Sequence, residues 1–150
     1  MKHILLDSSP LSLLSQPAQT PEVVLITAWA ANCLATGHHL YLPEVIDYEI
    51  RRELVRAKKT AGISKLNAFK GTLRYLPLTT DTMLLAADLW ARSGQSGKPT
   101  GDPKKIDIDI ILSAQALSLR VPVSDIIIAT TNVGHLSLFV PADLWSNITP

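Results

Sequence analysis

Ile126-Ile127-Ile128-Ala129-Thr130 is the stretch that decides the fold, because it is apolar without interruption and then ends at a polar residue. A strand with one face in water alternates apolar and polar residues, whereas a strand covered on both faces is apolar throughout. His3-Ile4-Leu5-Leu6-Asp7 and Leu40-Tyr41-Leu42 repeat the continuous pattern earlier in the chain, with helical patterns between them. This alternation predicts an α/β fold with a short-stranded, mostly parallel central sheet and helices on both faces.

The composition fits one domain over residues 1–150. Hydrophobic residues make up 47% of the chain and charged residues 18%, so the chain can bury a core. The single cysteine, Cys33, excludes an internal disulfide and a four-cysteine zinc site. No apolar run approaches the about 20 residues that span a bilayer, and the amino terminus has no signal-peptide pattern. We therefore expect a cytoplasmic protein that does not bind membranes.

Caps, prolines and glycines set the expected boundaries of the remaining elements. Gly37 should end one helix, and Gly62 should stop the helix that begins at Pro43. Glycines and prolines between residues 93 and 105 predict a loop. The expected helices are 10–16, 22–36, 43–59, 64–72, 79–92 and 107–119, with a further strand at 75–78, a short turn or helix at 134–139 and a closing tail at 141–150.

The charges are distributed unevenly although the net charge is only +1. Residues 51–74 contain eight lysines and arginines and a single acid, Glu53, so the rest of the chain is acidic. Arg52, Arg56 and Lys59 should lie beside Glu49 on the helix, away from its apolar face. A basic face of this kind fits a phosphate backbone, although many charge runs are only solvated surface.

Acidic and polar side chains follow the predicted strands where ligands of open α/β sheets bind. Asp7 ends the first strand and Thr130-Thr131-Asn132 ends the last, while Glu49 and either Asp107 or Asp109 lie early in two helices. Converging carboxylates repel one another unless their pKa values rise or a cation neutralises them. Without a cysteine cluster, that cation would be Mg²⁺ or Mn²⁺, which prefer oxygen ligands.

Each of these residues also has a purely structural interpretation. Asp7 could cap the helix that follows it, Glu49 could pair with Arg52 or Arg56, and Asp107 could cap its own helix. Asn132 could be a turn residue, and His135 is more often structural than catalytic. A phosphate-binding P-loop is excluded, because Gly97-Lys98-Pro99 has proline where that motif needs a hydroxyl residue.

The ordered set of motifs resembles the PIN-domain nucleases, particularly the VapC-like toxins of bacterial toxin–antitoxin pairs. The matching segments span nearly the whole chain: Ile4–Pro10, Leu42–Leu54, Asp109–Ala116 and Ile128–Asn132. The resemblance implies a three-layer α/β/α PIN-like fold and metal-dependent hydrolysis of RNA. It also implies a cognate antitoxin as partner and a homodimer.

The resemblance carries three metal ligands onto this chain: Asp7, Glu49 and Asp109. Asp109 is preferred to Asp107 because the small residues after it then fall where the family has them. The fourth family position, usually aspartate, is Asn132 here, which would position water or a second, weaker ion. We therefore expect Asp7, Glu49, Asp109 and Asn132 to form the catalytic site.

Two functions remain open at this stage. The first is a Mg²⁺- or Mn²⁺-dependent endoribonuclease whose substrate contacts are Arg52, Arg56, Lys59 and Thr130. The second is a catalytically weak or inactive PIN-like module that binds RNA or a partner protein through the basic surface of residues 51–74. Binding of Mn²⁺ should separate them, because three convergent carboxylates should take up the ion and stabilise the fold.

Overall fold

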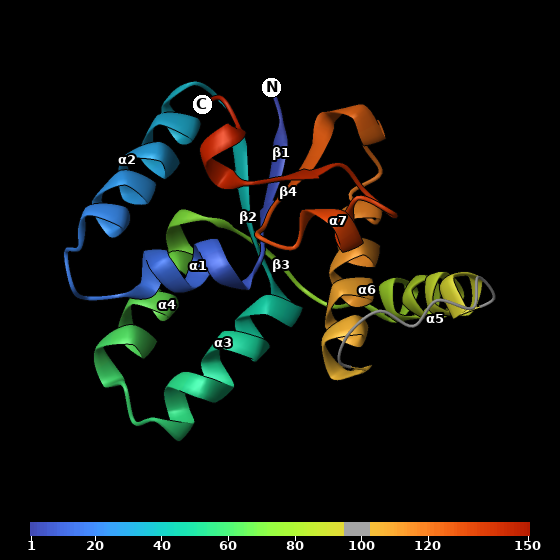
Figure 1. Cartoon of the computed structure of the whole chain (residues 1–150), viewed down its shortest axis with the longest axis horizontal. Helices are drawn as coiled ribbons and strands as arrows, with labels where there is room; N and C mark the ends of the chain where they lie inside the picture. Colours follow the sequence, from blue (N-terminus) through green and yellow to red (C-terminus); the bar gives the residue numbers. More distant parts are fainter. Residues whose placement is uncertain (95–102) are drawn as a thin grey trace.

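A five-stranded sheet, all of whose neighbouring strands run parallel, forms the centre of the computed structural model, which describes residues 1–94 and 103–150 (Figure 1). The strand order is β3-β2-β1-β4-β5, so the first strand of the chain is the central one. The predicted parallel sheet of short strands is confirmed. The strands are β1 (His3–Leu6), β2 (His39–Pro43), β3 (Arg74–Leu76), β4 (Ile126–Ala129) and β5 (Ala142–Asp143).

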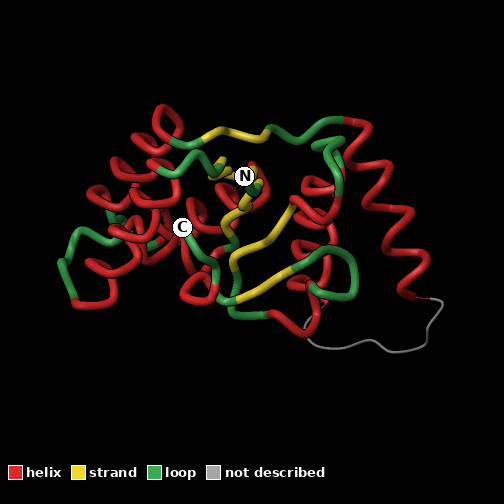
Figure 2. Tube along the Cα trace, turned by 90° about the horizontal axis from the view of Figure 1, so that it is seen from above, coloured by secondary structure: helices red, strands yellow, loops and turns green. Residues whose placement is uncertain are grey.

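Helices cover both faces of the sheet and complete the predicted three layers. The helices α1, α2 and α4 lie on one side and α5 and α6 on the other (Figure 1). Figure 2 shows α5, which leads into the grey trace, at the outer edge of the molecule. No helix of the described residues is long and apolar enough to cross a bilayer. The α-helices are α1 (Ser8–Ser15), α2 (Pro21–Ala35), α3 (Glu44–Arg56), α4 (Thr60–Thr72), α5 (Thr80–Gly94), α6 (Pro103–Leu117) and α7 (Val133–Leu136); two 3₁₀ turns lie at Val123–Asp125 and Trp145–Asn147.

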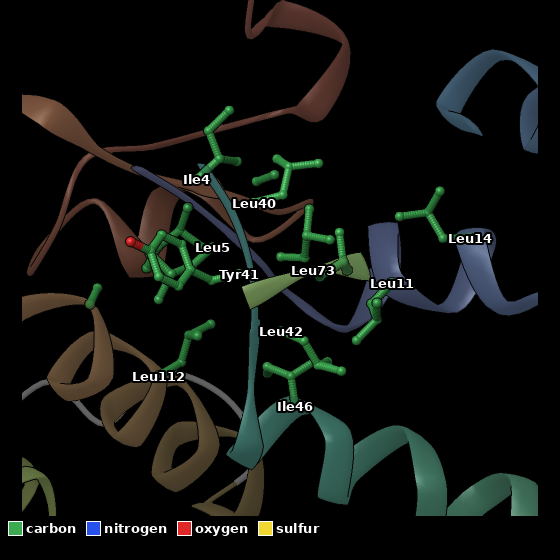
Figure 3. Packing of buried hydrophobic residues seen from close by; sticks show 14 of the residues in the cluster. Ile4, Leu5, Leu11, Leu14, Leu40, Tyr41, Leu42, Ile46, Leu73 and Leu112 are labelled. Carbon is green, nitrogen blue, oxygen red and sulfur yellow. The ribbon is translucent and has the colours of Figure 1, made fainter. Parts of the chain in front are cut away.

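The core explains why the strands lack polar residues. Ile4, Leu5 and Leu6 of β1 are completely buried, since one face meets α1 and α2 and the other meets α6. In Figure 3, Leu14 of α1 and Leu112 of α6 lie on opposite sides of the strands. Full burial of one such side chain contributes about 1.5–3 kcal/mol to the free energy of unfolding.

The boundary between α3 and α4 differs from the prediction. The helix α3 ends at Arg56, and the chain turns at Lys58, whose φ is 55°. Gly62 does not stop a helix but lies inside α4, where an added Cβ would come within 3.0 Å of Leu54 Cδ2. A larger residue at this position would have to displace the flexible end of the Leu54 side chain by a few tenths of an ångström. Gly37, by contrast, follows the end of α2 with a φ of 92°, as its helix-ending role requires.

Smaller differences concern the second half of the chain. The helix α6 already begins at Pro103, so Asp107 lies within it and does not cap it. The strand β3 starts one residue earlier than expected and is shorter. Ala142–Asp143 forms a fifth strand in the segment predicted to be a closing tail. Of the predicted loop at 93–105, residues 95–102 lie outside the described residues.

Candidate active site

The carboxyl ends of β1 and β4 bring Asp7 and Thr130 together. Leu6 and Ala129 are register partners, so the residues that follow them are neighbours across the sheet. Asp7 Oδ2 accepts a hydrogen bond of 2.7 Å from the Thr130 hydroxyl, and Oδ1 accepts one of 2.7 Å from the Ser8 amide at the start of α1. Asp7 therefore does cap α1, as one interpretation of the sequence expects, yet the same side chain faces the edge of the sheet where ligands bind.

Glu49 lies in the second turn of α3 and is half-buried. Burial is the main cause that raises the pKa of Glu49, and the negative charges of Asp7 and Asp109 raise it further. A hydrogen bond from the Ser8 side chain and the positive charge of Arg52 act in the opposite direction. Its surroundings thus include two other carboxylates and one arginine.

Asp109 is buried in α6 and held by two donors. Its Oδ2 accepts a hydrogen bond of 2.8 Å from Asn132 Nδ2 and lies 2.9 Å from His135 Nδ1. Only 2% of Asp109 is exposed, whereas Asp107 is an exposed residue one half-turn away. The geometry therefore brings Asp109, and not Asp107, to the interior edge where Asp7 and Glu49 lie.

The chemistry of this donor set suits a hard divalent cation. Asp7 and Asp109 are buried oxygen ligands, and the pKa of Glu49 is raised mainly by burial and further by the negative charges of these two aspartates, which a cation would offset. In the residues that the structure describes, however, no three His, Cys, Asp or Glu side chains are arranged closely enough to hold a metal ion. A shared ion would therefore require the three carboxylates to draw closer together.

A groove of about 720 Å³ extends from this edge of the sheet between α1 and the α3–α4 turn. Ser8 and Glu49 line it at the carboxylate end, and Lys58 and Lys59 line it at the turn. Of the three predicted basic substrate contacts, Lys59 lines the groove. Glu53 lines the groove as well, so its wall carries both acidic and basic side chains. Such a groove can accommodate a chain of phosphates beside a cation.

The other predicted contacts are placed differently. Arg52 lies over the Tyr48 ring, 5.2 Å from its centre, and also acts on Glu49. Arg56 is exposed and forms an ion pair of 2.8 Å with Glu53. Thr130, predicted to contact substrate, is only 1% exposed. Its hydroxyl donates to Asp7 and accepts from the Asn132 amide at 2.8 Å, so in this structure it positions those two residues.

Sequence reasoning missed the contact between His135 and Asp109. The two residues are 26 positions apart, and His135 belongs to the short helix α7, whose orientation no local pattern predicts. The edge-on packing of its ring against Phe139 fixes the imidazole, with ring centres 5.9 Å apart. Asn132 likewise binds Asp109 with its side chain, which the turn interpretation does not require.

Comparison with solved structures decides what kind of fold carries this site. Three similar chains come from crystal structures of VapBC2 from Rickettsia felis bound to a DNA fragment from their promoter, VapBC-1 from nontypeable Haemophilus influenzae, and DNA-bound VapBC from Salmonella typhimurium. Their TM-scores are 0.70, 0.67 and 0.61. This chain has the PIN-like fold.

The structural similarity extends over almost the full length of the chain, but the sequence identity is low. The three matches cover 95%, 98% and 97% of this chain and 98%, 100% and 99% of the others, at 14%, 14% and 15% identity. No protein-family model and no curated protein sequence matches the chain. The resemblance to the VapC-like toxins drawn from the sequence motifs is therefore confirmed at the level of the fold.

Proposed function

We propose that this protein is a divalent-metal-dependent endoribonuclease that hydrolyses RNA phosphodiester bonds in the cytoplasm, as the toxin of a toxin–antitoxin pair. The observation that carries the proposal is that Asp7, directly after β1, and Asp109 of α6 both lie near enough to Glu49 of α3 for their charges to act on it. Two of the carboxylates are buried, and both act on the third. Holding two buried acids beside a third, half-buried one costs stability unless a cation balances their charge.

Asp7, Glu49 and Asp109 would hold Mg²⁺ or Mn²⁺, with their oxygens as ligands. A bound divalent cation supplies positive charge that stabilises the charge developing on a scissile phosphate and makes water more acidic. Thr130 fixes the orientation of Asp7 through its hydroxyl, and Asn132 and His135 fix that of Asp109. Such outer contacts are what aim carboxylates at a shared ligand.

Lys59 and Lys58 would hold the RNA backbone in the groove that begins at Glu49. Arg52 is close enough to offset the charge of Glu49 and could also meet a phosphate. Binding of RNA should therefore weaken steeply with added salt. A cognate antitoxin completes the proposal, supported by the sequence resemblance and by the VapBC proteins that share the fold. The proposed homodimer rests on the sequence resemblance alone.

The test compares two aspartates that lie two residues apart on α6. Asp109→Asn and Asp7→Asn should abolish Mn²⁺-dependent cleavage of RNA and the rise in melting temperature that Mn²⁺ causes. Asp107→Asn removes the same charge from an exposed position and should leave both unchanged. Wild-type cleavage by both Asp7→Asn and Asp109→Asn would refute the assignment. RNA binding without any uptake of Mn²⁺ would favour the inactive binding module instead.

A further inference from the structure

A group of basic and aromatic side chains lies at the amino ends of the strands, away from the carboxylates. His3, His39 and Arg74 are the first residues of β1, β2 and β3. His3 is the register partner of His39, and Tyr41 is the register partner of Arg74. Register partners share a face, as do residues two apart in a strand, so all four belong to the same face. In Figure 3 the Tyr41 ring lies on the Leu112 side of the sheet.

Hydrogen bonds connect Tyr41 with both His3 and Arg74. A guanidinium can only donate, so in the hydrogen bond between Arg74 and Tyr41 the phenolic oxygen is the acceptor. Tyr41 Oη lies 2.8 Å from His3 Nδ1, within hydrogen-bond distance. The His39 ring stands beside the His3 ring, with centroids 5.0 Å apart. The group therefore presents a guanidinium, which can only donate, beside two imidazole rings.

The charged groups that act on His39 are all positive. Burial is the main cause that lowers the pKa of His39, followed by the positive charges of Arg74, His3, His38 and the terminal amino group. None of the ion pairs among the described residues involves Arg74. Arg74 is exposed, and His3 and His39 are half-exposed, so the group is open to a ligand. A positive, donor-rich and open group is complementary to an oxyanion.

We propose that His3, His39 and Arg74 form a binding site for a phosphate-type oxyanion. Arg74 supplies the permanent charge and a guanidinium that can bind two oxygens at once. The two imidazoles add donors, and each gains charge when it is protonated. The site is separate from the proposed metal centre, because His3 and Asp7 lie four residues apart on β1, about 13 Å along the strand. It therefore stands whether or not the protein is a ribonuclease.

The test follows the ring signals of the four histidines by NMR during titration with sulfate, which keeps its double charge over the pH range used. Sulfate should shift the His3 and His39 signals saturably and leave His135 unaffected. The affinity should rise when the pH is lowered far enough to protonate His39, whose pKa is lowered from its ordinary value. Arg74→Gln and His39→Gln should each weaken binding about tenfold or more.

Arg92→Gln is the matched control, since it removes one positive charge from an exposed position on α5. It should leave the affinity for sulfate unchanged. Equal affinity in Arg74→Gln and wild type, or small unsaturated shifts of all histidines alike, would overturn the proposal. Circular dichroism checks that each variant folds, which is expected because Arg74 is exposed.

Two further titrations identify the source of the anion. Inorganic phosphate and a short single-stranded DNA oligonucleotide are added separately to wild type and to Arg74→Gln. If the oligonucleotide shifts His3 and His39 in an Arg74-dependent way, the ligand is a nucleic-acid backbone. If only phosphate and sulfate do so, the ligand is a small free anion. Absence of Arg74-dependent shifts with all three anions would overturn the proposal.

Discussion

Replacing Thr130 by valine should destabilise the protein by about 2–3 kcal/mol. The hydroxyl donates to the Asp7 carboxylate, and a hydrogen bond to a charged group contributes about 1.5–3 kcal/mol. The same hydroxyl accepts from the Asn132 amide, whose loss adds about 1 kcal/mol. The new buried methyl group of valine returns about 0.8 kcal/mol. The net loss should lower the melting temperature of this chain by about 4–12 °C.

Urea unfolding of wild type, Thr130→Val and Thr130→Ser measures the effect. Serine keeps the hydroxyl and loses only one methyl group, so it should cost about 1 kcal/mol. Hydrogen exchange of the Asn132 amide gives a second measurement, since it should stay protected in Thr130→Ser and exchange fast in Thr130→Val. The reasoning is refuted if Thr130→Val unfolds within about 0.5 kcal/mol of wild type, the scatter expected of a residue without specific contacts.

Three further substitutions or treatments test other parts of the structure. Glu49→Gln should stabilise the metal-free protein more at about pH 8 than at about pH 4. The reason is that the pKa of Glu49 is raised in the folded protein, so its ionisation lowers the free energy of unfolding as the pH rises. Urea unfolding at both pH values measures the difference. Gln115→Leu should cost about 2–4 kcal/mol in urea unfolding, since the buried Gln115 amide accepts from the Val45 amide and donates to the Leu76 carbonyl. Cys33 should not react with a thiol reagent in the folded protein at about pH 8, because burial raises the pKa of its thiol to about 11.

Each of these expectations has a result that contradicts it. A pH-independent effect of Glu49→Gln would mean that neither burial nor the neighbouring carboxylates raise the pKa of Glu49. If Gln115→Leu changes the free energy of unfolding by less than about 1 kcal/mol, water replaces the lost hydrogen bonds. Gln115→Glu is the comparison variant, since it keeps the oxygen that accepts from the Val45 amide. Reaction of Cys33 at the rate of an unfolded control peptide would show that α2 opens readily from the sheet.

Much of the site was predictable because it depends on where strands end. Asp7 directly follows a continuous apolar strand, and parallel strands place their carboxyl ends at one edge of the sheet. The preference for Asp109 over Asp107 came from the family resemblance, and the structure buries Asp109 and exposes Asp107. The metal role of these residues stays a prediction, to be tested with Mn²⁺.

The rest depended on contacts between residues far apart in the chain. The turn at Lys58 and the placing of Gly62 inside α4 arise from the packing of α4 on α3, and glycine by itself signals either a stop or a close approach. The strand β5 (Ala142–Asp143), in the tail of the chain, is too short to show an alternation of apolar and polar residues. It is defined only by its pairing with β4. His135 reaches Asp109 only because α7 folds back over α6.

By itself, the sequence determined the fold class, since buried strands must be apolar throughout, and it determined which acids follow them. Only the tertiary structure decided how those acids are held. It assigned the Thr130 hydroxyl to Asp7, gave Asp109 two donors, and separated Lys59, which lines the groove, from Arg56, which pairs with Glu53. The physical reason is that hydrogen bonds and ion pairs act over a few ångströms, and distant residues reach that range only after the sheet and helices have packed.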